Sequence, residues 1–337
     1  MIRDVYLITG VSGLIGSSIV KKIIASEDYQ MGKILILGVV RDKKSALDSF
    51  SDYNCDFFEI IEADILQLTE CINALKSKEL SPDYIIHCAA PTKSSYMISN
   101  PVETVDSIVN GTRNMLELAR KYNSKSMVYL SSMEVYGKID CDNNNRVQED
   151  ELGELSLFEV RSCYPLGKRM AENLCYLYYK EYHVPVKIAR LAQVFGKGIL
   201  PGEKRVFAQF ANAVRKKQNI VLHTLGNSTG NYCDIGDAVN AIMLLLNKGS
   251  DGEAYNVVNE TNTMTIRQMA DLVAGEVAEG SISVEYDIPE GNQYGYATDT
   301  GLRMSSAKIE ALGFRPTKNL REMYIDMIKY MDENRFI

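Results

Sequence analysis

Six short apolar runs between residues 5 and 191, separated by polar and helix-compatible stretches, constrain the fold more than any other feature of this sequence. The runs are continuously hydrophobic rather than alternating, which is typical of strands buried on both faces of a parallel sheet. We therefore predict an α/β fold with a doubly wound parallel sheet, whose ligand crevice lies at the carboxyl ends of the strands. The runs are VYLITG (5–10), KILILGVV (33–40), FFEIIEAD (57–64), YIIHCAA (84–90), SMVYLSS (126–132) and VPVKIARL (184–191).

The pattern changes after residue 192, where the Gly- and Pro-containing stretch FGKGILPGEKR precedes a helical segment. Further on, DIGDAVNAIMLLLNKG (234–249) has the period of an amphipathic helix, and EAYNVVN (253–259) resembles a strand. We expect this strand to return to the main sheet, so that two domains are interleaved. The predicted ranges are 1–191 with 233–258 for the larger domain, and 192–232 with 259–337 for a smaller, substrate-binding domain.

Two further segments complete this organisation. We expect DCDNNNRVQEDELGE (140–154) to be a polar surface loop, because it is rich in Asn, Asp and Glu. The tail from about Thr263 onward is predicted to be mostly helical.

Composition excludes several classes of partner. A net charge of −7 gives no electrostatic case for binding nucleic acid or an anionic membrane, and no apolar run is long enough to span a bilayer. The seven cysteines form no C-x-x-C pair, which suits reduced thiols and a cytoplasmic location. The three histidines share no metal-ligand spacing, so we predict no metal site.

A glycine-rich turn joins the first predicted strand to the first predicted helix. Glycines there permit a tight turn and a close approach of the backbone to a pyrophosphate, which the free N–H groups of the helix N-terminus would bind. Because the motif lies at this junction, we assign residues 1–191 to a dinucleotide-binding domain of the Rossmann type. The candidate residues are Gly10, Ser12, Gly13, Leu14, Ile15 and Gly16.

The end of the second predicted strand bears on which dinucleotide binds. An acidic residue there would bind the adenine ribose hydroxyls, whereas an arginine can accommodate a 2′-phosphate. The sequence has Arg41 at this point, followed by Asp42 and two lysines. NAD and NADP both remain possible cofactors, and Arg41 favours NADP slightly. Asp64 and Ile65, after the third strand, are expected to flank the adenine ring.

The stretch RSCYPLGKRMAE (161–172) places Tyr164 and Lys168 four residues apart, on one face of a helix. Ser131 and Ser132 end the fifth predicted strand, at the same crevice. A Lys cation favours the phenolate form of a neighbouring tyrosine, which can then accept or donate a proton as hydride moves. We predict Tyr164 and Lys168 as catalytic and cofactor-binding residues, and Ser132 as the residue that holds the reacting oxygen of the substrate.

Together these motifs resemble the extended short-chain dehydrogenases/reductases that modify nucleotide sugars. The resemblance covers almost the whole chain and is carried by TGVSGLIG (9–16), HCAA (87–90), NGT (110–112), SSMEVYG (131–137), YPLGK (164–168) and LGFRP (312–316). Within this family, AAPTKSSYMISNP (89–101) and the catalytic helix are similar to UDP-glucuronate decarboxylases and related dehydratases and epimerases.

The resemblance implies further site residues and partners. Glu134 matches an active-site glutamate and would act with Ser132, Tyr164 and Lys168. The substrate would be a nucleotide-diphosphate sugar, and the protein a homodimer formed through the helices at 100–122 and 162–182. Beyond these, the resemblance implies cofactor contacts at Ala89 and Ala90 and sugar contacts at Lys93, Met133, Gln193 and Arg205.

The sequence departs from the family pattern at four positions. Dehydratases carry Asp-Glu where this chain has Met133-Glu134, and a methionine cannot protonate a leaving hydroxyl, so 4,6-dehydration is disfavoured. Gln193 replaces the usual asparagine, and Gly230 replaces the arginine expected at the substrate diphosphate. Arg41 is unusual for an enzyme that retains and recycles NAD.

Three functions therefore stay open. One is transient oxidation of the sugar at C4, followed by epimerisation or decarboxylation, in the synthesis of surface-glycan precursors. A second is a net NADPH-dependent reduction of a nucleotide-activated keto sugar, which Arg41 favours. The third is a protein without catalysis that senses a dinucleotide, a function for which the Tyr164 and Lys168 pair is unnecessary.

Overall fold

The computed structural model describes residues 3–48, 50, 53, 56–139, 145–289 and 299–336. The chain forms two compact units. Unit 1 comprises residues 1–137, 154–191 and 239–255, and unit 2 comprises 138–153, 192–238 and 256–337. Residues 138–153 thus lie in unit 2, although the sequence analysis placed them in the larger domain. Cys55 and Cys141 fall outside the described residues, and the other five cysteines are free thiols.

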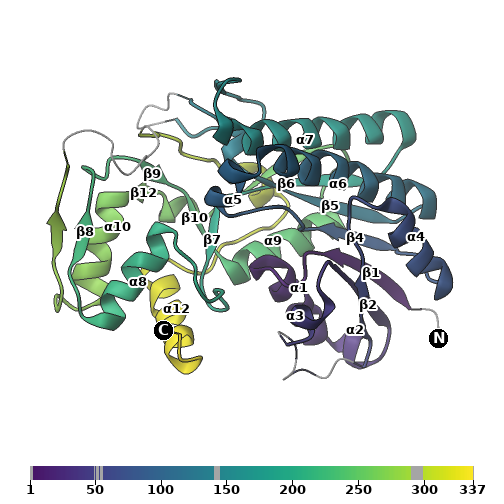
Figure 1. Cartoon of the computed structure of the whole chain (residues 1–337), viewed down its shortest axis with the longest axis horizontal. Helices are drawn as coiled ribbons and strands as arrows, with labels where there is room; N and C mark the ends of the chain where they lie inside the picture. The colour runs from purple at the N-terminus through teal and green to yellow at the C-terminus, as the bar shows by residue number, and fades with distance from the viewer. Residues whose placement is uncertain are drawn as a thin grey trace. The chain divides into compact units, whose positions relative to one another are not determined.

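Unit 1 is built on a seven-stranded sheet with the order β11-β6-β5-β4-β1-β2-β3 (Figure 1). The paired strands run parallel, as in β1 with β2 and β4, which confirms the predicted doubly wound α/β fold. The segment predicted to return to the sheet does so as β11, which is hydrogen-bonded to β6. The strands are β1 (Asp4–Thr9), β2 (Ile34–Val40), β3 (Phe58–Glu62), β4 (Tyr84–His87), β5 (Ser126–Ser132), β6 (Val186–Leu191) and β11 (Ala254–Val257).

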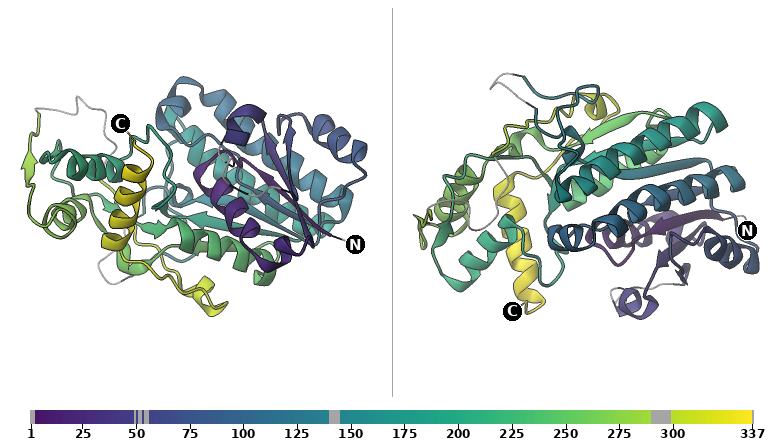
Figure 2. Two further views of the ribbon diagram at one scale, coloured as in Figure 1. Left: turned by 90° about the horizontal axis from the view of Figure 1, so that it is seen from below. Right: turned by 45° about the horizontal axis from the view of Figure 1, so that its top comes forward.

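Helices cover both faces of this sheet, because its strands are apolar on both sides. Sheet residues such as Leu7 and Met127 share a buried core with Met115 of α6 and Leu174 of α7. Figures 1 and 2 show α6 and α7 on one face and α1 with α9 on the other. The helices are α1 (Leu14–Ile24), α2 (Glu27–Gln30), α3 (Lys43–Asp48), α4 (Leu68–Ser77), α5 (Ser94–Ser99), α6 (Pro101–Tyr122), α7 (Cys163–Tyr182) and α9 (Ile235–Lys248), with the 3-10 turns η1 (Met133–Tyr136) and η2 (Val160–Ser162).

Unit 2 has its own core, in which Phe195, Phe207 and Tyr324 are fully buried. Its strands form three short pairs: β7 with β10, β9 with β12, and β8 with β13. The strands are β7 (Gln193–Phe195), β8 (Ile220–Leu222), β9 (Thr229–Gly230), β10 (Tyr232–Asp234), β12 (Met264–Thr265) and β13 (Val284–Tyr286). The remaining elements are α8 (Val206–Lys216), η3 (Glu260–Asn262), α10 (Ile266–Leu272), the π-helical turn η4 (Val273–Val277), α11 (Ala307–Ala311) and α12 (Leu320–Glu333).

The tail is less helical than predicted. Between η4 and α11, the described residues contain no helix. Instead, β13 pairs in parallel with β8, a strand far upstream in the sequence. Local helical propensity could not reveal this pairing, because a distant partner determines it. In the described part of the chain, no helix is long and apolar enough to cross a membrane.

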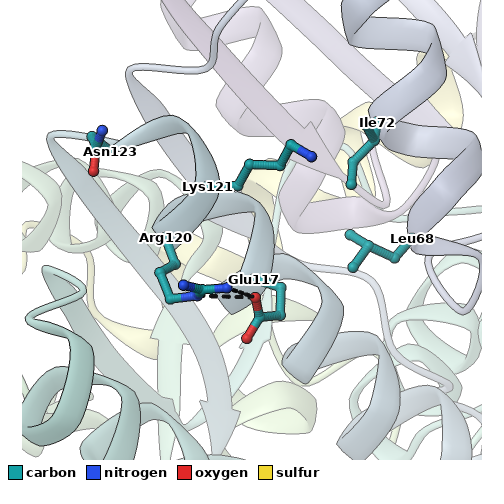
Figure 3. A pocket seen from close by; sticks show the side chains of 6 residues that line it. All are labelled: Leu68, Ile72, Glu117, Arg120, Lys121 and Asn123. Carbon is teal, nitrogen blue, oxygen red and sulfur yellow. Dashed lines mark hydrogen bonds and ion pairs between the residues drawn. The ribbon is translucent and has the colours of Figure 1, made fainter.

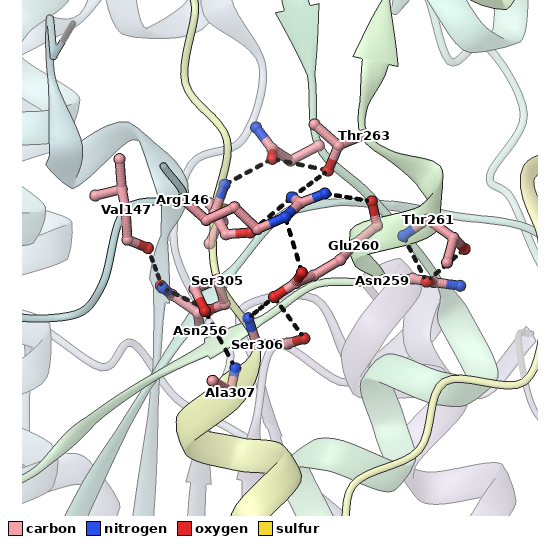
Figure 4. Close-up of polar contacts among 12 residues, drawn as sticks. Arg146, Val147, Asn256, Asn259, Glu260, Thr261, Thr263, Ser305, Ser306 and Ala307 are labelled. Carbon is pink, nitrogen blue, oxygen red and sulfur yellow. Dashed lines mark hydrogen bonds and ion pairs between the residues drawn. The ribbon is translucent and has the colours of Figure 1, made fainter. Parts of the chain in front are cut away.

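Arg146 anchors part of the segment that was predicted as a surface loop. Its guanidinium contacts the Glu260 carboxylate at 2.8 Å and donates to the Met304 carbonyl at 3.1 Å (Figure 4). The neighbouring Val147 is buried and forms a β-bridge with Met304. The prediction of a surface loop is therefore wrong for Arg146 and Val147. It is confirmed for residues 148–154, which are mostly exposed and contain no helix, while residues 140–144 lie outside the described residues.

Thr9, at the end of β1, holds the end of β4. Its Oγ1 accepts hydrogen bonds from the N–H groups of Cys88 and Ala89 at 3.1 and 3.0 Å. Both lone pairs are thus used, so the hydroxyl proton is donated to His87 Nδ1, 2.8 Å away. The proton of the neutral imidazole must then be on Nε2, which is buried and has no hydrogen-bond partner in the described part of the chain.

His87 makes this arrangement sensitive to acid. Burial, and then the positive charge of Lys168, lowers the pKa of His87 to about 3. In the unfolded chain the same histidine binds a proton near its ordinary pKa of about 6.5. Between these two values the unfolded state holds more protons, so falling pH favours unfolding.

We expect the His87→Asn variant, whose amide oxygen can still accept from Thr9, to lose less stability than wild type between pH 7 and pH 5. The difference should be about 2 kcal/mol in the free energy of unfolding. Over the roughly 1.5 pH units between 6.5 and 5, only unfolded wild type binds a proton at residue 87, and the variant lacks this effect. Urea unfolding of both proteins at the two pH values measures it. Identical losses would show that His87 is not held neutral.

Candidate active site

The glycine turn between β1 and α1 has the geometry that a pyrophosphate requires. Gly10 has φ of +69°, and a Cβ there would lie 3.0 Å from the Ala89 nitrogen. A Cβ on Gly16 would lie 2.3 Å from the Gly10 carbonyl oxygen, so only glycine fits. Gly13 caps α1 without a side-chain hydrogen bond, and the first turn of α1 has no acidic residue. The N–H groups of this helix end can therefore bind an anion, and the site fits the expected dinucleotide.

The other predicted dinucleotide residues lie in unit 1, at the ends of neighbouring strands. Arg41 directly follows β2 and is exposed. Asp64 follows β3, and its Oδ1 accepts a hydrogen bond from the Leu66 N–H at 2.9 Å, which fixes the turn. Ile65 packs its side chain on Gly111 of α6. Ala89 and Ala90 follow β4 and are partly exposed.

Tyr164 and Lys168 both project from the first two turns of α7. Lys168 is 3% exposed; its Nζ donates to the Leu130 carbonyl at 2.7 Å and lies 5.7 Å from the centroid of the Tyr164 ring. Burial lowers the pKa of Lys168 to about 8, while the negative charge of Glu172 acts in the opposite direction. At neutral pH most of the Lys168 side chains are thus still charged. The helix accepts Pro165 because it lies in the first turn, where a backbone N–H is not needed.

Ser132 and Glu134 lie where β5 passes into η1. The Ser132 hydroxyl oxygen accepts from the Glu134 N–H at 3.2 Å and so caps this turn. The Glu134 carboxylate accepts a hydrogen bond from Arg161 Nη2 at 2.9 Å. Met133, between them, is partly buried, and Lys93 lies exposed at the N-terminus of α5. The structure thus brings the four predicted catalytic side chains to the end of β5 and the start of α7.

A buried polar network lies beneath these four side chains. Ser131 points away from Ser132, as neighbours in a strand do, and donates to Glu172 of α7. Arg190 of β6 forms an ion pair with the Glu172 carboxylate at 2.7 Å and donates to the Tyr136 hydroxyl at 3.1 Å. The network therefore joins β5, β6, α7 and η1.

Gln193 and Arg205 belong to unit 2. Oε1 of Gln193 is buried and finds no hydrogen-bond partner among the described residues. The Arg205 guanidinium forms an ion pair with Glu203 at 2.6 Å and lies over the Phe207 ring. The roles of Gln193 and Arg205 toward a sugar stay predictions.

Position 230, where the family arginine is missing, is also sterically closed. A Cβ on Gly230 would lie 2.2 Å from the hydroxyl oxygen of Tyr232. Tyr232 is fully buried, so an arginine at position 230 could not be accommodated unless this ring moved. The packing of unit 2 around Tyr232 therefore requires a small residue at position 230 and is consistent with Gly230 in place of the expected arginine.

A hollow on the surface of unit 1, of about 440 Å³, is separate from these residues (Figure 3). It lies between α4 and α6, and two of its three charged residues, Arg120 and Glu117, form an ion pair with each other at 2.8 Å. None of the predicted site residues lines it. Among the described residues, no group of His, Cys, Asp and Glu side chains is placed to hold a metal ion.

The sequence analysis missed Arg161, Glu172 and Arg190. Glu172 follows Lys168 by four residues, so helical spacing alone could have placed it beside the lysine. Arg161 stands in the stretch that was singled out, yet nothing local links it to Glu134, 27 residues earlier. Nothing in the sequence indicated that Arg190 belongs to the site, because it stands in an apolar run that was predicted as a buried strand.

The chain is similar in sequence and fold to several known proteins. The relatives include a dTDP-D-glucose 4,6-dehydratase of Dictyostelium discoideum, 29% identical over 258 residues, or 74% of this chain and 57% of that protein. UDP-glucuronic acid decarboxylase 5 of Arabidopsis thaliana is 28% identical over 94% of this chain and 86% of its own length. The solved structure of a UDP-glucose 4-epimerase of Thermotoga maritima with UDP-glucose shares the fold, with a TM-score of 0.81, 21% identity and coverage of 98% and 99%.

The family model that matches extends over most of the chain. It describes the NAD dependent epimerase/dehydratase family and covers residues 6–258, from β1 through β11. This range includes the glycine turn and the four side chains at the end of β5 and the start of α7. The chain therefore belongs to the NAD dependent epimerase/dehydratase family, whose members among its relatives are enzymes that act on nucleotide sugars.

Proposed function

We propose that this protein oxidises a nucleotide-diphosphate hexose at C4 and then decarboxylates or epimerises the 4-keto sugar. The observation that carries the proposal is the position of Tyr164 beside the buried Lys168 at the start of α7, in the same unit as the glycine turn and as Ser132 and Glu134 at the end of β5. The names of its relatives support the same class of substrate.

Each of these side chains has a role in the proposed reaction. The dinucleotide, when bound, accepts or returns a hydride. Tyr164 removes the proton of the C4 hydroxyl, and the charge of Lys168 stabilises the phenolate that this requires. Ser132 would hold the C4 oxygen by a hydrogen bond, and Glu134, two residues further on in η1, would act on the neighbouring carbon.

Met133, between Ser132 and Glu134, bears on which step can follow the oxidation at C4. Loss of water from the sugar needs a group that protonates the leaving hydroxyl, and the Met133 thioether has no proton to give. Decarboxylation needs no such acid, because the 4-keto group itself accepts the electrons released with CO₂. We therefore favour UDP-glucuronate as the first substrate to test.

A second candidate function is a net reduction of a keto sugar by NADPH. The observation that favours it is Arg41, which directly follows β2 and forms no ion pair within the described residues. Its guanidinium could therefore bind a 2′-phosphate. This candidate also uses Tyr164 as the proton donor.

Replacing Tyr164 by Phe tests the acid–base role that both candidates share. We expect turnover of UDP-glucuronate, or of whichever sugar nucleotide proves to be the substrate, to fall by at least about 100-fold, in the range of general acid–base catalysis. Dinucleotide affinity, measured by calorimetry, should change little. Product chromatography measures turnover, and an undiminished rate would contradict the proposed mechanism.

Replacing Arg41 by Ala tests the choice of cofactor. If Arg41 binds a 2′-phosphate, the affinity for NADPH should fall about tenfold or more, because a charge-assisted contact is lost. The affinity for NADH should stay the same. Replacing the exposed Lys33 of the same unit by Ala is the control for net charge. Equal losses for both cofactors, or none, would show that Arg41 does not bind a 2′-phosphate and would remove the support for NADPH.

A further inference from the structure

Arg161 lies between two of the predicted catalytic groups, although it was not itself predicted. One edge of its guanidinium meets Glu134, with Nη2 2.9 Å from Oε1. Its Cζ lies 5.3 Å from the centroid of the Tyr164 ring. Nη1 is buried and has no hydrogen-bond partner in the part of the chain that the structure describes. The cation is therefore held against the tyrosine by contacts that do not depend on a ligand.

The charges around Tyr164 come from several elements. Lys168 contributes a positive charge from α7, Arg161 a second one from η2, and Glu134 a negative charge from η1. The Tyr129 ring of β5 lies close to Lys168, and Cys163 precedes Tyr164 in the chain. With Tyr164 as a phenolate, these two cations and two anions sum to zero. Without Arg161, the same set would carry a net negative charge whenever the phenolate forms.

We propose that Arg161 is a positioning residue for the Tyr164 acid–base group: it fixes Glu134 and offsets its negative charge, so that the phenolate can form beside a carboxylate. Glu134 alone would oppose ionisation of Tyr164, because a nearby negative charge disfavours the formation of a second one. When Glu134 is paired with Arg161, its carboxylate can contact the sugar without opposing the ionisation of Tyr164. The inference rests on the proposed role of Tyr164.

The test reads the ionisation of Tyr164 directly and needs no substrate. Protein labelled with ¹³Cζ-tyrosine is titrated by NMR, and the Tyr164 resonance is identified by its absence from the Tyr164→Phe protein. In Arg161→Gln we expect the titration midpoint of Tyr164 to rise by about one pH unit, the size expected for one charge at this distance near a protein surface. In Glu134→Gln it should fall by a similar amount.

The double variant and two controls make the test decisive. Arg161→Gln combined with Glu134→Gln should return the midpoint close to that of wild type, since both opposing charges are gone. Arg161→Lys should retain most of the wild-type behaviour, and Arg113→Gln, which removes an exposed cation of α6, should not move the midpoint. Circular dichroism confirms that each variant is folded.

Two outcomes would overturn the proposal. An unchanged midpoint in folded Arg161→Gln would show that the guanidinium does not act on Tyr164. A shift of equal size in Arg113→Gln would show that only net charge matters. Because neither readout involves turnover, either result is distinguishable from a failure of the proposed reaction, which the Tyr164→Phe assay tests.

Discussion

The buried ion pair between Glu172 and Arg190 is the interaction on which the candidate site depends. Both side chains are almost fully enclosed, and their contacts reach Ser131 at the end of β5 and Tyr136 at the end of η1. Removing one partner of such a pair leaves an uncompensated charge in the interior, which typically costs about 3–5 kcal/mol. The pair therefore holds β5 and α7, which carry or precede the four predicted catalytic side chains, against each other.

The same carboxylate also influences Lys168, one helical turn away. Burial alone would depress the pKa of this lysine, and the negative charge of Glu172 limits the effect, so that the pKa stays at about 8. A neutral lysine could not stabilise a phenolate. Glu172 thus has two effects: it pairs with Arg190 in the interior, and its negative charge helps to keep Lys168 protonated. Arg161 forms a second ion pair near Tyr164, with Glu134.

Much of unit 1 could be predicted from the sequence because its signals are local. Continuous apolar runs indicated the strands, glycines marked the turn before α1, and a spacing of four residues placed Tyr164 beside Lys168. The pairing of Arg161 with Glu134 and of Arg190 with Glu172 could not be predicted, because it depends on which segments the fold brings together. The same reason explains the errors in unit 2, where Val147 meets Met304 and β13 pairs with β8.

The central claim is that unit 1 transfers a hydride between a dinucleotide and a sugar carbinol next to Tyr164. The most direct measurement is the absorbance at 340 nm after rapid mixing of the protein, loaded with NAD⁺ or NADP⁺, with UDP-glucuronate, UDP-glucose or dTDP-glucose. We expect at least one of these sugars to produce a signal of reduced nicotinamide in wild type, and none of them to do so in Tyr164→Phe. Protein that binds the dinucleotide but gives no signal with any of the sugars, or an equal signal in Tyr164→Phe, would contradict the central claim.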